Sequence, residues 1–143
     1  MDLTFCIVTW NSAATLKAVI QRIMKQNLLP NILIYDNGST DGTVEMVKAF
    51  IKSRWFEGAT IELIEDIHME GGRVRNIAHC RYMLSQRAES KYIMFVDSDV
   101  LLPPFIMGRL VKELDNPKLG MIGVRYEPNA NHVKMGATLL RTE

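Results

Sequence analysis

The sequence has few cysteines and no long apolar run. Its 143 residues contain only two cysteines, Cys6 and Cys80, which form no CxxC pair. Such low cysteine use excludes the disulfide framework of a small secreted domain and favours a reduced, intracellular protein. The longest apolar stretch, residues 100–108, is broken by two prolines and is far shorter than the roughly 20 residues of a membrane-spanning helix. We therefore expect no transmembrane segment.

Net charge is also nearly absent. Seventeen Lys and Arg residues face sixteen Asp and Glu residues, which leaves a net charge of +1. This balance gives no electrostatic reason to expect nucleic acid as a partner. The N-terminal residues carry an acid, Asp2, in place of a basic segment, so they do not predict a signal peptide. We expect a cytoplasmic protein, and peripheral attachment to the cytoplasmic face of the membrane stays open.

Two nucleotide-binding motifs are missing as well. The sequence has neither the GxGxxG fingerprint of dinucleotide-binding folds nor the GxxxxGK[ST] motif of a P-loop. Their absence argues against a kinase or ATPase of the P-loop type. The composition, 48% hydrophobic and 23% charged, is that of a globular chain. Its length predicts a single domain over residues 1–143.

Strand-like and helix-like segments alternate along the chain. The apolar, β-branched runs predict strands at residues 3–10, 31–35, 60–64 and 92–96. Helical spacing of apolar residues predicts a helix after each strand; the four helices contain residues 16–24, 44–51, 73–88 and 107–114. Strand–helix alternation predicts an α/β fold, a mostly parallel sheet with helices on both faces.

The second half of the sequence also predicts a buried helix face, a helix start and two more strands. We expect the helix over 73–88 to turn Val74, Ile77, Ala78 and Leu84 inward. The last helix is expected to open at Pro103–Pro104, because proline suits a first helical turn. Two further strands are expected at 119–126 and 132–140, joined by a turn at 127–131.

Polar clusters follow three of the predicted strands. They are Thr9–Ser12, Asp36–Asp41 and Asp97–Asp99. In open α/β sheets, ligands bind beyond the carboxyl ends of the strands. The three loops are therefore expected to meet at one site.

The segment Asp97-Ser98-Asp99 carries the most chemistry. Two carboxylates at a strand exit offer hard oxygen ligands to Mg²⁺ or Mn²⁺. The same residues also suit a helix N-cap and a solvated loop, and the spacing alone favours neither interpretation. The position directly after the most hydrophobic strand favours the metal site.

Asp36 stands at the tip of its strand, at the start of the turn sequence 36–43. In one interpretation Asp36 accepts a hydrogen bond from a bound nucleobase or ribose, as the acidic residue of dinucleotide-binding folds does with ribose. The other makes the segment a strand-to-helix turn in which Asp41 or Thr43 caps the helix.

Four segments, taken in order, resemble the successive motifs of family 2 glycosyltransferases with the GT-A fold. They are FCIVTWN at 5–11, IYDNGSTDGT at 34–43, GGRVRN at 71–76 and FVDSD at 95–99. The resemblance covers about residues 3–104. It implies a nucleotide-diphosphate sugar, UDP- or GDP-linked, as donor and a divalent ion, Mn²⁺ or Mg²⁺, as cofactor.

The resemblance also implies roles for single residues. Thr9, Asp36 and Asp66 match positions that contact the nucleobase, and Arg75 matches one near the nucleotide. Asp97 matches an acid beside the ribose and the metal, and Asp99 matches the metal ligand. Trp10, Asn11 and Ser98 complete the expected donor-binding set, with Trp10 stacking in the nucleotide pocket.

The implied activity is metal-dependent transfer of a sugar to an acceptor hydroxyl, expected to invert the anomeric centre. Family members often mark their general base with a Glu-Asp pair, but no such pair follows Asp99. The base is therefore unidentified, and the acceptor side is expected to be short or missing. A catalytically weak nucleotide-sugar-binding module and a truncated enzyme stay open as alternatives. A nucleotidyltransferase is disfavoured because residues 9–14 contain no glycine and no basic residue. The sugar, the acceptor (glycan, lipid or protein) and self-association into a homo-oligomer stay open.

Overall fold

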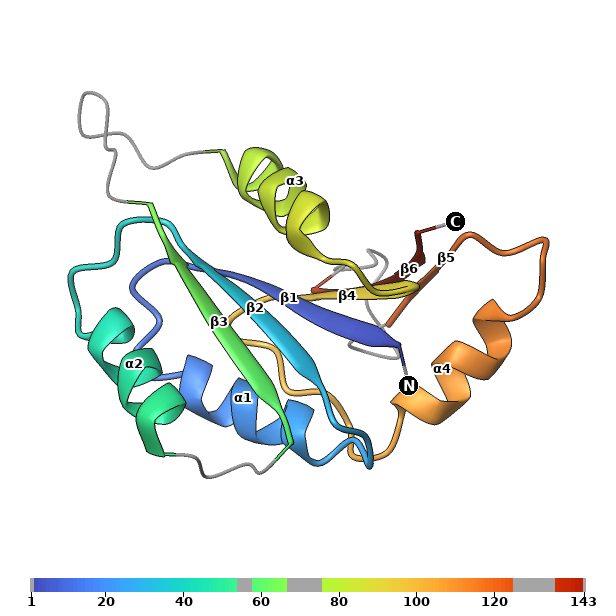
Figure 1. Ribbon diagram of the computed structural model, residues 1–143, viewed down its shortest axis with the longest axis horizontal. Helices are drawn as coiled ribbons and strands as arrows, with labels where there is room; N and C mark the ends of the chain where they lie inside the picture. Colours follow the sequence, from blue (N-terminus) through green and yellow to red (C-terminus); the bar gives the residue numbers. More distant parts are fainter. Residues whose placement is uncertain (1, 54–57, 67–75, 125–135, 143) are drawn as a thin grey trace, which may run out of the picture.

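The structure, a computed structural model, describes residues 2–53, 58–66, 76–124 and 136–142. Within these residues six strands form one sheet in the order β3-β2-β1-β4-β6-β5 (Figure 1). The strands are β1 (Leu3–Thr9), β2 (Asn31–Asp36), β3 (Thr60–Glu65), β4 (Tyr92–Val96), β5 (Met121–Gly123) and β6 (Ala137–Arg141). The four strands β1–β4 are parallel, whereas β6 runs antiparallel to both β4 and β5.

Four helices cover the two faces of this sheet unequally. They are α1 (Leu16–Met24), α2 (Thr43–Ser53), α3 (Ile77–Arg87) and α4 (Met107–Leu114). Helices α1, α2 and α4 lie on one face and α3 lies on the other (Figure 1). The expected α/β fold, a mostly parallel sheet with helices on both faces, is confirmed.

The alternation of side chains along β1 explains the two layers. Phe5 and Ile7 point into the larger core, which they share with α1, α2 and α4. Cys6 points the other way, into a smaller core with Cys80 and Leu84 of α3. Because successive strand residues face opposite sides, one strand supplies both cores.

The strand order places a topological switch point beside β1. The chain builds β2 and β3 on one side of β1 and β4 on the other. The register pairs Thr9 with Asp36 and Asp36 with Glu65, so the carboxyl ends of β1, β2 and β3 lie level. Sheets of this kind bind ligands at such a point.

Helix α3 differs from the sequence-based expectation. Asn76 caps it, with its Oδ1 accepting a hydrogen bond from the amide of Ala78 at 2.8 Å. Cys80 and Leu84 are buried, but Ile77 is 51% exposed and Ala78 is exposed too. Leu84 was therefore predicted correctly, whereas Ile77 and Ala78 were not. Ile77 lines the hollow at the strand ends instead of packing into the smaller core. Val74 lies outside the described residues.

The end of the chain also differs. Helix α4 begins at Met107, after Phe105, whose φ of 60° is left-handed and ends any helical path from the two prolines. The prediction that Pro103–Pro104 opens the helix is therefore wrong. Of the two strands expected at 119–126 and 132–140, the structure shows Met121–Gly123 and Ala137–Arg141; residues 125–135, with the predicted turn at 127–131, lie outside the described residues. Among the described residues, no helix is long and apolar enough to cross a membrane.

The exposure of α3 gives a first prediction. Leu84→Ala should destabilise the fold by about 2–5 kcal/mol, because it leaves a cavity in the smaller core. Ile77→Ala on the same helix should change the free energy of unfolding by only about 0.5 kcal/mol. Urea unfolding followed by circular dichroism measures both values. Equal losses would contradict the way α3 packs on the sheet.

Candidate functional site

A hollow of about 430 Å³ lies at the carboxyl ends of β1 and β4. It is lined by Val8, Trp10, Asn11, Ser12, Ala14, Thr15, Ile77, Asp97, Ser98 and Asp99. These residues come from the loop after β1, the loop after β4 and the start of α3. Two of the three predicted loops therefore meet here.

The turn Asp97–Asp99 is fixed by the start of α1. The hydroxyls of Ser98 and Ser12 lie 2.8 Å apart, and Thr15 donates a hydrogen bond from Oγ1 to the Ser98 carbonyl at 2.9 Å. The amide of Asp97 donates to the carbonyl of Gly136 at 2.7 Å. Asp99 is exposed at the rim of the hollow. The turn thus has a set conformation and still presents a carboxylate to solvent.

Asp97 is partly withdrawn from solvent. Its Oδ1 lies 2.8 Å from Nη2 of Arg81, and its side chain is 39% exposed. Burial raises the pKa of Asp97, while the nearby Arg81 opposes the rise and the Asp99 carboxylate adds to it. The two carboxylates therefore differ in environment although they are two residues apart.

Four hydrogen bonds join the loop after β1 (residues 10–15) to the loop after β2 (residues 37–42) and the first residue of α2. We call them the cross-loop clamp. They run from Asn11 N to Ser39 Oγ (2.9 Å), from Thr40 N to Asn11 Oδ1 (2.8 Å), from Ser12 N to Thr43 Oγ1 (2.9 Å) and from Ala13 N to Asp41 Oδ2 (3.0 Å). Asn11 adopts a left-handed φ of 47°, which asparagine tolerates better than most residues. The clamp fixes the wall of the hollow that carries Trp10.

Asp41 is the acid of this clamp. Its carboxylate accepts hydrogen bonds from the amide and hydroxyl of Thr43 and from the amide of Ala13. The hydroxyl of Thr43 and then the amide of Ala13 lower the pKa of Asp41, because both stabilise the ionised form. The interpretation of this segment as a structural turn therefore accounts for Asp41.

Thr9 and Asp36 lie beside the hollow but do not line it. Asp36 is 3% exposed, and its carboxylate accepts hydrogen bonds from the amides of Gly38 and Ser39 and from the Ser39 hydroxyl. Thr9 is 1% exposed, and within the described residues its Oγ1 has no hydrogen-bond partner. Both side chains lie on the α1–α2 side of the sheet, as Ile7 and Ile34 do two residues earlier.

Asp66 and Arg75 are not gathered into the hollow either. The Asp66 carboxylate accepts a hydrogen bond from the Tyr35 hydroxyl at 2.8 Å, and its amide donates to the carbonyl of Asp36. Asp66 therefore lies at the end of β3, two strands away from β1. Arg75 lies outside the described residues.

Five of the predicted site residues thus share one hollow: Trp10, Asn11, Asp97, Ser98 and Asp99. Sequence reasoning missed the contributions of Thr15 and Ile77. Ser12 stood inside one of the polar clusters, but its contact with Ser98 joins residues 86 positions apart. No local pattern predicts such a contact.

The acids that follow Asp99 lie elsewhere. Glu113 pairs with Arg109 on α4, and the carboxylate of Asp115 accepts a hydrogen bond from the hydroxyl of Tyr92, the first residue of β4. Asp115 therefore lies at the amino end of the strand whose carboxyl end borders the hollow. Among the described residues, no acid after Asp99 lines the hollow.

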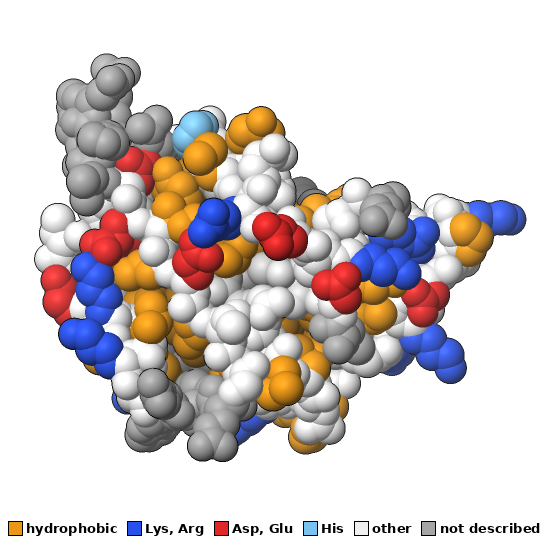
Figure 2. All heavy atoms as spheres, viewed as in Figure 1, with side chains coloured by type: hydrophobic (Ala, Val, Ile, Leu, Met, Phe, Trp, Pro, Cys, Tyr) orange, Lys and Arg blue, Asp and Glu red, His pale blue; other side chains and the backbone are white. Residues whose placement is uncertain are grey.

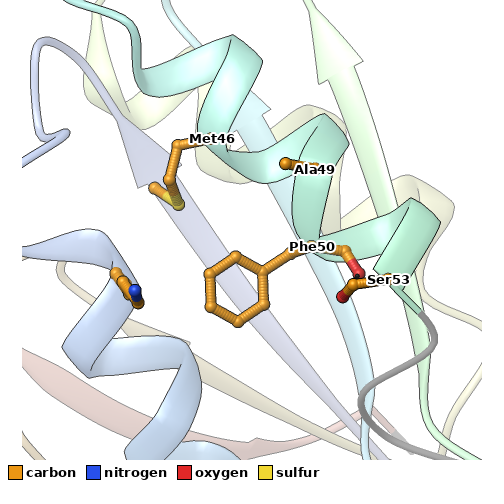
Figure 3. A pocket seen from close by; sticks show the side chains of 5 residues that line it. Met46, Ala49, Phe50 and Ser53 are labelled. Carbon is orange, nitrogen blue, oxygen red and sulfur yellow. Dashed lines mark hydrogen bonds between the residues drawn. The ribbon is translucent and has the colours of Figure 1, made fainter.

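A second hollow lies between α1 and α2. Figure 3 shows Met46 and Phe50 of α2 pointing toward α1 across a groove of about 240 Å³, which Lys17, Ala49 and Ser53 also line. Its lining is largely apolar, with Lys17 as the charged member. It suits a diphosphate less well than the hollow at the strand ends.

Figure 2 shows how the charged side chains of the described residues are distributed on one face of the molecule. On the face in Figure 2, basic and acidic side chains are interspersed rather than gathered by sign. Proteins that bind nucleic acid through its phosphates concentrate Lys and Arg on one face. Among the described residues, the face in Figure 2 shows no such concentration.

The comparisons with known proteins identify the family. The model of glycosyl transferase family 2 matches residues 4–140. The chain therefore belongs to glycosyl transferase family 2. This membership favours the glycosyltransferase over the nucleotidyltransferase interpretation. No curated protein sequence matches the chain.

Solved structures share the fold at low sequence identity. The mannosyltransferase PcManGT from Pyrobaculum calidifontis, in complex with GDP-Man and Mn²⁺, has a TM-score of 0.83 and 18% identity over 98% of this chain and 44% of its own. TarS 1–349 from S. aureus has a TM-score of 0.77 and 15% identity, over 99% of this chain and 47% of its own. Glucosyl-3-phosphoglycerate synthase from Mycobacterium tuberculosis, with Mn²⁺, UDP and glucosyl-3-phosphoglycerate, has a TM-score of 0.68 and 15% identity, over 97% and 56%. The sheet and its helices thus form the GT-A fold, and the chain spans about half the length of these proteins.

The lowered pKa of Asp41 gives a second prediction. Because the fold holds this carboxylate ionised, its contribution to stability is complete above its ordinary pKa of 3.8 and is lost as pH falls below that value. The difference in Tm between the wild type and Asp41→Asn should therefore be largest at neutral pH and shrink below pH 3.8. Thermal unfolding from pH 7 to about pH 3 measures it.

Glu113→Gln is the control for this experiment, because it removes an exposed acid from α4. Exposed ion pairs contribute little, so this variant should stay close to the wild type throughout. A difference for Asp41→Asn that is the same at every pH would contradict the charged clamp.

Proposed function

We propose that this chain binds a nucleotide-diphosphate sugar, UDP- or GDP-linked, in the hollow at the strand ends and takes part in transferring its sugar to an acceptor hydroxyl. The observation that carries the proposal is the meeting of Asp97 and Asp99 with Trp10 in one hollow at the switch point of the sheet. Structural neighbours bound to GDP-Man or UDP together with Mn²⁺ support it.

The side chains at the hollow fit a divalent ion such as Mn²⁺ or Mg²⁺. No cluster of three or more His, Cys, Asp or Glu occurs among the described residues, so a closed metal cage is not available there. Mg²⁺-type sites need only one or two carboxylates and complete their coordination with water and substrate phosphates. Asp99, exposed at the rim, would hold the ion, and Asp97 lies beside it. A bound ion would stabilise negative charge on the departing diphosphate.

The walls of the hollow suit the nucleoside. Trp10 is 53% exposed and offers an aromatic face on which a nucleobase can stack. Asn11 and Ser98 are polar residues that also line the hollow. Thr9, Asp36, Asp66 and Arg75 stay in the proposal as donor-binding residues, although Thr9 and Asp36 are buried and do not line the hollow.

The transfer also needs a group that accepts the proton of the acceptor hydroxyl. Departure of the diphosphate leaves the anomeric carbon oxocarbenium-like, and attack from the opposite face inverts it. A carboxylate within hydrogen-bond reach of the hydroxyl would act as the general base.

A second candidate function follows from the placement of the acids. Because no described acid after Asp99 lines the hollow, the chain by itself would act as a nucleotide-sugar-binding module with weak or no transfer. Release of UDP or GDP from donor sugars, followed over time, separates the two functions. Turnover supports the transferase, and binding without turnover supports the module.

Asp99→Asn tests the metal part of the site. This variant should keep the Tm of the wild type without ligand, because Asp99 is exposed. It should lose the added stabilisation that UDP or GDP gives with Mn²⁺; that stabilisation is about 2.7 kcal/mol at 100 times the Kd. Thermal-shift measurements with Mn²⁺, Mg²⁺ or EDTA read it out.

Glu113→Gln again serves as control and should keep the full metal-dependent shift. An undiminished manganese-dependent shift in Asp99→Asn would remove Asp99 from the metal site.

Trp10→Ala tests the nucleobase part. Loss of stacking should weaken nucleotide binding by about 1–3 kcal/mol, with Mn²⁺ and with EDTA alike, because the ring acts on the base and not on the diphosphate. Trp10→Phe keeps an aromatic face and should recover much of the affinity. Isothermal titration with UDP and GDP measures both variants, and unchanged affinity in Trp10→Ala would show that the base binds elsewhere.

A further inference from the structure

Arg81 lies next to the hollow without lining it. From α3 its guanidinium reaches the turn after β4, where Nη2 lies 2.8 Å from Oδ1 of Asp97. The guanidinium carbon also lies 5.7 Å from the centre of the Phe95 ring. Phe95 and Asp97 are two residues apart, so they point to the same side of the sheet. The guanidinium is therefore held by both an aromatic face and a carboxylate.

The contact with Arg81 engages only one of the two carboxylate oxygens of Asp97. Within the described part of the chain, Oδ1 is bound to Arg81 and no hydrogen bond reaches Oδ2. The Arg81 side chain is 35% exposed and the Asp97 side chain 39%, so the pair is partly withdrawn from water. A guanidinium is planar and always charged, which makes it well suited to hold a carboxylate in one orientation.

We propose that Arg81 is a positioning residue for the donor site. It holds the Asp97 carboxylate by Oδ1, so that Oδ2 is presented to the nucleotide-diphosphate sugar, and it leaves Asp99 as the carboxylate that takes the divalent ion. This role rests on the proposed function.

Charge balance supports this division of roles. Asp97 and Asp99 both line the hollow, and like charges at short distance repel each other. Arg81 offsets the charge of Asp97, so the turn keeps one net negative charge for the metal. A carboxylate already engaged by a guanidinium is also a weaker ligand than a free one. The site is thereby arranged before the donor arrives.

Helix α3 offers a matched control for the experiment. Arg87 also pairs with a carboxylate of the sheet: its Nη2 and Nε lie 3.0 Å from Oε1 of Glu62. Glu62 stands on β3, away from the hollow. Arg81→Met and Arg87→Met therefore each remove one arginine–carboxylate pair from the same helix, and only the first concerns the proposed site.

The measurement is the affinity for UDP and GDP with Mn²⁺ by isothermal titration, together with the Tm of each variant. Arg81→Met should bind about 10- to 100-fold more weakly than the wild type, the usual cost of losing a group that orients a ligand. Arg81→Lys should recover part of the affinity. Arg87→Met should bind as the wild type does.

A double-mutant cycle separates positioning from a general loss of structure. In the background of Asp97→Asn, the change Arg81→Met should cause no further loss of affinity. Should Arg81→Met prove too unstable, Phe95→Leu removes the aromatic support and should weaken binding in the same direction.

Two failures can be told apart. If the wild type binds UDP or GDP with Mn²⁺ and Arg81→Met binds equally well, the role of Arg81 is overturned and the proposed function stands. If the wild type binds neither nucleotide, the proposed function is overturned and the role of Arg81 falls with it.

Discussion

The cross-loop clamp is the constraint on which the site depends. Strands β1 and β2 end level with each other, so the loops that follow them start side by side. The hydrogen bonds from Asn11, Ser12 and Ala13 to the second loop and α2 fix both loops to each other. Because Ser12 and Thr15 then hold Ser98, the clamp also determines where the turn after β4 lies. One hydrogen-bonded unit thereby positions residues from three parts of the chain.

The same constraint explains why so many polar residues at the strand ends are structural. Asp36 accepts hydrogen bonds from the amides of Gly38 and Ser39, and Asp41 accepts one from the amide of Thr43. Backbone amides need such partners wherever they make no helix or strand hydrogen bond. Asp99 is freely exposed instead, and Asp97 is engaged on one side only. The chemistry of the hollow therefore falls to a few side chains that the loops hold in place.

Much of this architecture could be predicted from the sequence, because hydrophobic periodicity identifies β1–β4 and the helices between them. Thr9 and Asp36 face the same side of the sheet as Ile7 and Ile34, but the nearly continuous apolar runs of β1 and β2 do not show which side holds the larger core. Other features depend on packing that no local pattern encodes. Ile77 lines the hollow and not the smaller core, and the pair Arg81–Asp97 exists only once α3 lies on the sheet.

The central claim is that a nucleoside diphosphate and a divalent ion bind together at the carboxyl ends of β1 and β4. The most direct test is a ¹H–¹⁵N NMR spectrum of the chain with UDP or GDP and paramagnetic Mn²⁺, compared with the same sample containing Mg²⁺. The account predicts that Mn²⁺ broadens the indole signal of Trp10 and the amide signals of Ser98 and Asp99. Signals from the opposite end of the sheet, such as Asn31 and Glu89, should stay sharp. Broadening centred on the groove between α1 and α2, or none at all, would contradict the site.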